Sequence, residues 1–334
     1  MTWRRRVMVV VSVALAVVLL AVLIKIGGVN LHETFRQLRS VSLISFAKVV
    51  SLNALLVYVS TQKWRIIDAA WRHPSDSVPS RANAWALTSV GLAMGIFLPV
   101  QLAMATARTL GTRVHGRALK RGTAGTLLEQ GFDVLTVGFL AVASGITWFY
   151  HGGEKTWALC ASAAIVLALL AVEPSVRMIR WVAASCNTPT GGPRNRILHR
   201  VWALQHSGIL NAGLARRLVV LSALRFGTVV LTSIATAEAV GLHIPVWQMA
   251  AAIPFVIIAS VIAVTPGGIG LNELAYAGAL EVFGTPFAIG AQWALANRVL
   301  VAVSYLFVAA CGATLLLMCK ISTLGARRSL GDRV

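Results

Sequence analysis

The hydrophobic residues of this chain gather in long runs, which short clusters of charged and turn-forming residues separate. Most of these runs reach the ~20 residues that a helix needs to cross the apolar layer of a bilayer. The pattern predicts apolar helical segments at eight places, residues 7–28, 43–62, 84–110, 123–150, 157–172, 215–241, 247–284 and 286–319.

Two of these segments are interrupted by residues that break helices. Pro99 lies inside residues 84–110, and Pro-Gly-Gly-Ile-Gly at residues 266–270 lies inside residues 247–284. Proline removes a backbone donor and glycine favours open backbone, so each segment should break in mid-membrane. Such backbone persists there only inside protein or beside a water-filled cavity. The sequence therefore predicts an all-α polytopic membrane protein with about six spanning helices and two oppositely oriented re-entrant (broken) helical hairpins.

Composition supports insertion into a membrane. Of the 334 residues, 57% are hydrophobic and 12% are charged, against about 25% charged in globular domains, and the mean hydropathy is +0.77. We expect no soluble domain and a single transmembrane domain over residues 1–334. The four cysteines and seven histidines show no metal-ligand spacing, and no phosphate-binding loop of the Gly-x-x-x-x-Gly-Lys-Ser/Thr type is present. We therefore expect no metal, no cofactor and no ATP site.

The basic residues indicate how the chain is oriented. Lys and Arg number 30 against 11 Asp and Glu, for a net charge of +19. If both broken segments leave by the side they entered, 22 of the 30 fall on one face, which predicts a cytoplasmic (inner) membrane protein with both termini cytoplasmic. The charge then favours contact with anionic lipid head groups rather than nucleic acid. The clusters are Arg4 to Arg6, Lys63/Arg65/Arg72/Arg81, Arg113/Arg117/Lys120/Arg121, Arg177/Arg180/Arg194/Arg196/Arg200/Arg216/Arg217 and Lys320/Arg327/Arg328/Arg333.

The opposite loops carry little positive charge. They lie around residues 30–42, 151–156 and 242–246 and hold only Arg36, Arg39 and Lys155. At the start of the chain, the apolar run after Arg6 is longer than a signal-peptide core and lacks an obvious small-residue cleavage site, which favours a retained signal anchor over a cleaved signal peptide.

The two breaks divide the chain into similar halves. Pro99 and Pro266 are half the chain apart, and each broken segment has one span before it and one after it. The first hairpin would enter from the cytoplasm and the second from outside, as in the inverted repeats of transporters. We expect half A at about 43–150, a linking segment at about 173–214 and half B at about 215–319. Within the linking segment, residues 194–211 are predicted either as an interfacial helix or as a loop packed on the protein surface.

Seven charged residues within the apolar segments are functional candidates, and Glu281 is set aside because it lies near the end of its run. Each costs roughly 2.5–3.5 kcal/mol at a bilayer centre on insertion scales, so they are expected to face one another or a wet cavity. Glu129 and Asp133 are four residues apart, share a helix face and need a cation nearby. Arg108 and Arg298 are the natural partners. The seven residues are Arg108, Glu129, Asp133, Arg225, Glu238, Glu273 and Arg298.

Two interpretations of these charges remain open. They form an ion-pair network that only locks helices together, or Arg108 and Arg298 release a carboxylate to hold an anionic group with their planar forks. Glu273 either caps the helix after the glycines or couples transport to an ion or proton. Arg225 and Glu238 lie nearer the ends of their span and either join the network or reach toward water.

The residues around both breaks resemble the transmembrane region of lysylphosphatidylglycerol synthases and their stand-alone flippase-like relatives. Residues 265–273, Thr-Pro-Gly-Gly-Ile-Gly-Leu-Asn-Glu, resemble that family's Pro-Gly-Gly-x-Gly-x-x-Glu signature. Leu98-Pro99, then Arg108, then Glu129 and Asp133 resemble its other pattern, and the likeness extends over residues 84–319. The chain departs from the family where Ala103-Met104 replace a Gly-acid pair and where Gln130 replaces an arginine, so the charge of the first half differs.

The resemblance implies movement of a polar-headed lipid between leaflets, such as a phospholipid, a glycolipid or a polyprenyl-phosphate carrier, by a protein that is not an enzyme. Its expected partners are the lipid substrate and either a second copy of the chain or a synthase. A membrane enzyme acting on a lipid-linked phosphate or sugar, or a non-catalytic partner of a glycosyltransferase or synthase, is the alternative. The candidate substrate-binding residues are Pro99, Arg108, Glu129, Asp133, Pro266, Gly267, Gly268, Gly270, Glu273 and Arg298.

Overall fold

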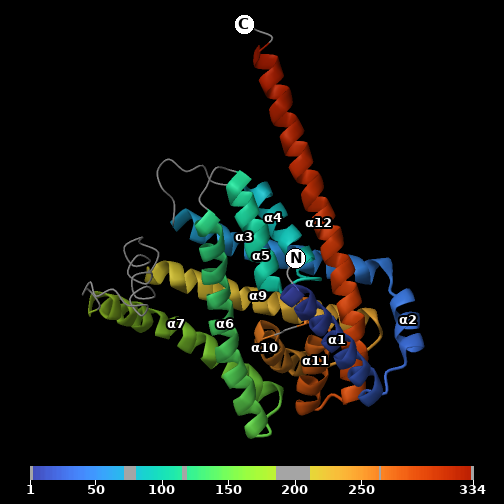
Figure 1. Cartoon of the computed structure of the whole chain (residues 1–334). Coiled ribbons are helices and arrows are strands. Elements are labelled where there is room, and N and C mark those ends of the chain that lie inside the picture. Colours follow the sequence, from blue (N-terminus) through green and yellow to red (C-terminus); the bar gives the residue numbers. More distant parts are fainter. Residues whose placement is uncertain (1–2, 71–79, 115–118, 186–210, 263–264, 332–334) are drawn as a thin grey trace.

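The chain folds into a bundle of helices, shown in Figure 1 as a computed structural model. The structure describes residues 3–70, 80–114, 119–185, 211–262 and 265–331, and these residues form α-helices, one short 3-10 turn and no strand. The predicted all-α polytopic fold is confirmed. The helices are α1 (Trp3–Ile26), α2 (Leu31–Arg39), α3 (Leu43–Ala70), α4 (Arg81–Met94), α5 (Val100–Val114), α6 (Leu119–Phe149), α7 (Glu154–Ser185), α9 (Ala212–Ala239), α10 (Val246–Ile262), η1 (Pro266–Gly268), α11 (Leu271–Val282) and α12 (Phe287–Gly331).

The predicted number of membrane crossings agrees with the helix lengths. Within the described residues, five helices (α3, α6, α7, α9 and α12) are each long and apolar enough to span a membrane. A sixth span is possible where α1 continues into α2 across a bend of 94°. The second helix of this pair falls in a segment that the sequence predicted as a loop. It begins where the Asn30 side chain accepts a hydrogen bond of 3.2 Å from the Glu33 backbone N–H.

Both prolines lie at the turn of a helical hairpin. In the first hairpin, Gly91 of α4 faces Met104 of α5, while Leu87 faces Gly111, so the two helices run antiparallel. In the second, the rings of Trp247 at the start of α10 and Phe283 after α11 are 6.4 Å apart between centroids. The two predicted breaks are therefore present, and each turns the chain back on itself.

Each hairpin also packs against the other half of the chain. Helix α4 packs on α12 and helix α10 packs on α6, while α3 and α9 lie along each other (Figure 1). The hairpins meet at their tips, because a Cβ atom at Gly267 in the second break would lie 2.1 Å from the Ile96 carbonyl oxygen in the first. Each hairpin thus packs on a helix of the opposite half, whereas the inverted repeat and its boundaries stay predictions.

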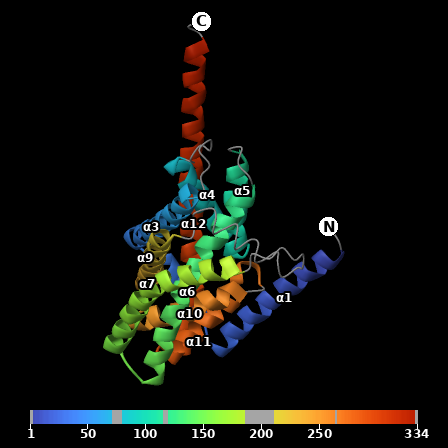
Figure 2. The same ribbon diagram turned by 90° about the vertical axis from the view of Figure 1, so that its left-hand side faces the viewer.

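Helix α1 packs against the outer face of the second hairpin, which α10 and α11 form. Figure 2 shows α1 running diagonally beside α10 and α11, and buried Leu23 packs in one cluster with Ala277 and Ala291. The approach is closest at the break, where a Cβ atom at Gly270 would lie 2.6 Å from Leu19 Cβ. The segment after Pro266 is thus enclosed by protein, as broken backbone at membrane depth must be.

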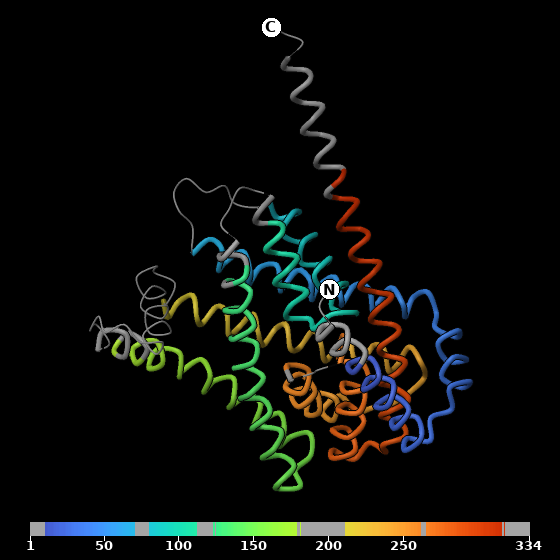
Figure 3. Tube along the Cα trace, in the orientation of Figure 1, coloured from blue at the N-terminus to red at the C-terminus, as the bar shows by residue number. Residues whose placement is uncertain are grey.

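The ends of the helices sort onto two sides. In Figure 1, the end of α3, the end of α5, the beginning of α6, the end of α7 and the beginning of α9 lie toward the top and left. In Figure 3, the connections α6–α7, α9–α10 and α11–α12 lie toward the bottom and right. The first group contains most of the predicted basic clusters, which agrees with the expected sorting. Residues 186–210, which include nearly all of the predicted interfacial helix, lie outside the described residues.

One residue of those clusters was assigned wrongly. Helix α3 has no proline or glycine and continues to Ala70, eight residues beyond the predicted end at residue 62. Lys63 is therefore a helical residue that is completely buried, and it does not belong to a cytoplasmic loop. Helices α7 and α12 likewise extend beyond their predicted apolar runs, to Ser185 and Gly331.

We predict that the bases of the two hairpins are reached from opposite sides of the membrane. Arg81 at the beginning of α4 and Glu281 near the end of α11 are both exposed. In a background without the four native cysteines, Arg81→Cys should react with an impermeant maleimide only from the cytoplasm and Glu281→Cys only from outside. Reaction of both from one side would contradict the opposite entry of the hairpins.

We also predict that the second break depends on its glycines. Gly267 has φ +57°, a conformation that costs a residue with a Cβ atom about 1–2 kcal/mol, and a Cβ atom there would meet the Ile96 carbonyl. Gly267→Ala should therefore lower the thermal unfolding temperature. The control is Gly278→Ala in α11, where an added Cβ atom meets nothing within 4 Å. It should leave the temperature unchanged or raise it slightly, since alanine favours a helix.

Candidate functional site

A cavity of about 840 Å³ lies where the two hairpins meet. Its walls come from α3, α4, α5 and α6 of the first half and from α9, α10, α11 and α12 of the second. Of the predicted substrate-binding residues, those that line the cavity are Pro99, Arg108, Glu129, Asp133, Glu273 and Arg298. Those that lie at the second break without lining it are Pro266, Gly267, Gly268 and Gly270.

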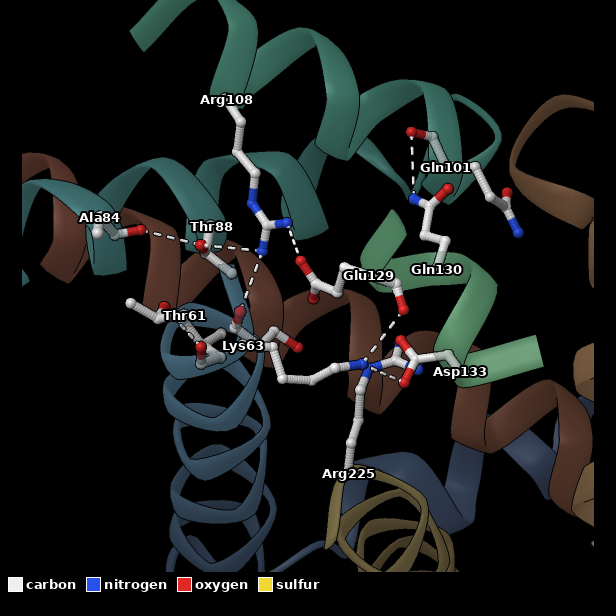
Figure 4. Close-up of polar contacts among 12 residues, drawn as sticks. Thr61, Lys63, Ala84, Thr88, Gln101, Arg108, Glu129, Gln130, Asp133 and Arg225 are labelled. Carbon is white, nitrogen blue, oxygen red and sulfur yellow. Dashed lines mark hydrogen bonds and ion pairs between the residues drawn. The ribbon is translucent and has the colours of Figure 1, made fainter. Parts of the chain in front are cut away.

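Arg108 and Glu129 form a buried ion pair between α5 and α6 (Figure 4). Arg108 has no exposed surface, and its second terminal nitrogen donates to the Ser60 carbonyl at 3.3 Å and to Thr88 Oγ1 at 3.4 Å. Its guanidinium also stacks over the Trp64 ring, 5.1 Å from the centroid, which adds a cation–π attraction. These contacts involve both terminal nitrogens of Arg108, whereas its Nε atom is buried without a hydrogen-bond partner among the described residues. Arg108 is therefore well placed to neutralise Glu129 inside the protein.

Asp133 lies one helical turn beyond Glu129 and has two cationic partners. Lys63 of α3 forms an ion pair with Asp133 Oδ1, and Arg225 of α9 lies 3.4 Å from Asp133 Oδ2 (Figure 4). Lys63 also donates to the Glu129 carbonyl at 3.4 Å. The carboxylate pair on α6 thus ties together three other helices, and each carboxylate has the cation that the sequence required.

Arg298 of α12 and Glu273 of α11 meet at the second break. Arg298 Nε lies 3.7 Å from Glu273 Oε1, and the other carboxylate oxygen accepts a 2.6 Å hydrogen bond from the Gly270 backbone N–H. Glu273 therefore occupies the capping position that one of the two interpretations proposed. The same carboxylate also faces Arg298, so Glu273 both caps α11 and forms an ion pair.

The ion pairs leave one positive charge in excess. Around the cavity, the described cations Lys63, Arg108, Arg225 and Arg298 number four, and the carboxylates Glu129, Asp133 and Glu273 number three. Lys63 is in closer contact with Asp133 than Arg225 is, and Arg225 makes no hydrogen bond to the described residues. The excess charge is therefore centred on Arg225, whose side chain is 21% exposed and lines the cavity.

The cavity reaches the apolar outer surface of the bundle between α5, α6 and α10. Four of its lining side chains are strongly exposed: Leu102 by 62%, Leu127 by 59%, Val134 by 41% and Val261 by 48%. A membrane protein presents such a surface to lipid tails. The cavity thus combines a charged interior with an apolar opening toward the side.

The sequence interpretation missed Lys63 and left the part played by Arg225 open. Lys63 was counted with a loop, although the absence of proline and glycine from residue 43 to residue 70 could have indicated that its helix continues. Arg225 joins the network, whereas Glu238 of the same helix forms an exposed ion pair of 2.6 Å with Lys48. Nothing in the sequence distinguishes these two residues, because only the packing of α9 on α3 and α6 decides which of them faces inward.

Neutral polar groups complete the lining. Gln130, at the position where the sequence departs from the family pattern, donates to the Gln101 carbonyl at 3.4 Å just after the first break. Asn272 also lines the cavity, and its Oδ1 atom is buried without a hydrogen-bond partner. Among the described residues, no three His, Cys, Asp or Glu side chains are grouped as metal ligands would be.

The family model described as the lysylphosphatidylglycerol synthase TM region matches residues 9–312. The chain belongs to this family. The match spans α1 to α12 and therefore includes both hairpins and the whole cavity. No curated protein and no solved structure gives a significant match. A lysylphosphatidylglycerol synthase TM region is a membrane unit related to lipids, and the chain is a multi-pass membrane protein.

We predict that Asp133 matters more for stability than either of its partners. Asp133→Asn leaves both Lys63 and Arg225 without a carboxylate partner, and an orphaned buried charge costs about 3–5 kcal/mol. Lys63→Met leaves Asp133 still facing Arg225 and should be milder. Thermal unfolding of the purified variants should rank parent, Lys63→Met and Asp133→Asn in falling order. Equal unfolding temperatures for the two variants would show that Arg225 does not share the carboxylate.

Proposed function

We propose that this protein moves an anionic, polar-headed lipid between the leaflets of the cytoplasmic membrane. The observation that carries the proposal is the excess positive charge of a cavity whose opening is apolar. A phosphate-bearing head group would balance the charge, and its acyl or prenyl chains would remain at the opening between α5, α6 and α10. A water-soluble anion has no use for such an opening.

Arg225 is the residue that would contact the head group first. Removing its attraction to Asp133 costs little, because Lys63 remains beside that carboxylate. Its planar guanidinium can hold two phosphate oxygens at once, which an ammonium group cannot do with the same geometry. Arg108, in contact with Glu129, Trp64 and Ser60, would keep Glu129 neutralised while the head group passes.

The carboxylates of the cavity favour transport over chemistry. Glu129, Asp133 and Glu273 each face a cation, whereas an enzyme acting on a lipid-linked phosphate or sugar needs an acid or base that is open to its substrate. The chain would work with both termini in the cytoplasm and use a gradient, metabolic demand or no energy source. A synthase that makes the lipid, or a second copy of the chain, would be its partner.

The test is transport by the purified protein in liposomes. A fluorescent phosphatidylglycerol should become accessible to an impermeant quencher faster with the parent protein than in empty liposomes, and Arg225→Gln should reduce that gain at least about tenfold, as loss of a charge-assisted pair predicts. Arg225→Lys should recover part of it.

The matched control is Arg36→Gln, which also removes an arginine from an ion pair with a glutamate, but on the exposed helix α2. It should transport like the parent. Full transport by Arg225→Gln, at an unchanged unfolding temperature, would exclude Arg225 as the head-group ligand. Absence of transport by the parent would refute the function itself.

A further inference from the structure

The guanidinium of Arg298 joins the tips of the two hairpins. Its Nη2 atom donates to the Gly267 carbonyl at 2.7 Å in the second break and to the Ile96 carbonyl at 3.3 Å in the first. These two carbonyls belong to residues more than half the chain apart in sequence. One side chain from α12 therefore holds together backbone from both halves, at the wall of the cavity.

Three oxygen atoms from both breaks face this guanidinium. Besides the two carbonyls, Glu273 Oε1 lies 3.7 Å from Nε. The same segment of the chain holds two further buried oxygens, Thr265 Oγ1 and Asn272 Oδ1, which accept no hydrogen bond from Arg298 or from any other described residue. Carbonyl, hydroxyl, amide and carboxylate oxygens around unwound backbone are the groups that coordinate Na⁺ in transporters with broken helices. In this protein the positive charge between the two breaks is the guanidinium of Arg298.

We infer that Arg298 is a built-in cation that occupies the place of a coupling Na⁺ between the two breaks. The inference deepens the proposed function and rests on it for its transport arm alone. Arg298 is then a positioning residue: it holds the hairpin tips together, and a head group passes when this bridge opens. Transport needs no Na⁺ at the breaks, because the tethered guanidinium supplies the charge.

The shape of the guanidinium is essential to this bridge. Nη2 of Arg298 donates to two carbonyls, and Nε faces the carboxylate of Glu273. These two nitrogens are separate donors that the guanidinium holds in one rigid plane. A lysine in its place offers one nitrogen and cannot satisfy both breaks and Glu273 in this arrangement. Arg298→Lys should therefore behave almost like Arg298→Ala. Removal of the side chain leaves a cradle of oxygens that a small external cation can enter.

The decisive experiment is chemical rescue of Arg298→Ala. The purified full chain is heated in choline chloride alone or with low-millimolar guanidinium chloride, urea or NaCl added. Guanidinium should raise the unfolding temperature of Arg298→Ala, by roughly 2 °C at about ten times its Kd. Na⁺ should raise it less, and urea, which has a similar shape but no charge, should not raise it. The parent and Arg36→Ala should show none of these shifts.

Transport provides a second, separate readout. Parent protein in liposomes should move fluorescent phosphatidylglycerol equally fast in Na⁺ and in choline media, and guanidinium should restore movement to Arg298→Ala. The inference is overturned if Arg298→Ala responds to guanidinium no better than to urea, if Arg298→Lys matches the parent, or if Na⁺ accelerates the parent severalfold. If the unfolding shifts occur but the parent moves no lipid, the bridge stands and the proposed function fails.

Discussion

The pairing of charges in the interior of an apolar helix bundle governs this structure. A lone charge at the bilayer centre costs roughly 2.5–3.5 kcal/mol on insertion scales, and the described cations and carboxylates around the cavity number seven. Each carboxylate therefore has to meet a cation from another helix. The packing of α3, α5, α6 and α9 follows from this requirement, because Glu129 and Asp133 point toward the three other helices from a single face of α6.

Among the described residues, the same pairing of charges also leaves one cation, Arg225, without a carboxylate of its own. Three pairs can be satisfied inside the protein, but the fourth cation shares a carboxylate that already has a closer partner. Arg225 is thus held in the wall of the cavity without being neutralised there. A network with equal numbers of cations and carboxylates would stabilise the helix bundle but would not attract an anion. The network of described residues in this protein stabilises the bundle and, with one cation in excess, also attracts a negative group. The apolar residues at the opening then restrict which anions can approach.

Sequence reasoning found the features that depend on local chemistry. Pro99 and Pro266 marked the breaks, the apolar runs marked the spans, and the spacing of Glu129 and Asp133 placed both on one helix face. The partners of the charged side chains could not be predicted from the sequence, because the contacts of Asp133 with Lys63 and of Arg298 with Ile96 join residues that are distant in the chain and meet only through tertiary packing. The position of Lys63 was wrong because an amphiphilic helix end resembles a loop when only hydropathy is considered.

The bridge at the hairpin tips also constrains the order of synthesis. The first break is made early, but the guanidinium that binds its Ile96 carbonyl lies on α12, 202 residues later. Until α12 has been made, that carbonyl lacks the donor that it has in the folded protein. The first hairpin can close on itself through α4 and α5, but a chain that ends before residue 298 lacks the bridge that joins it to the second break.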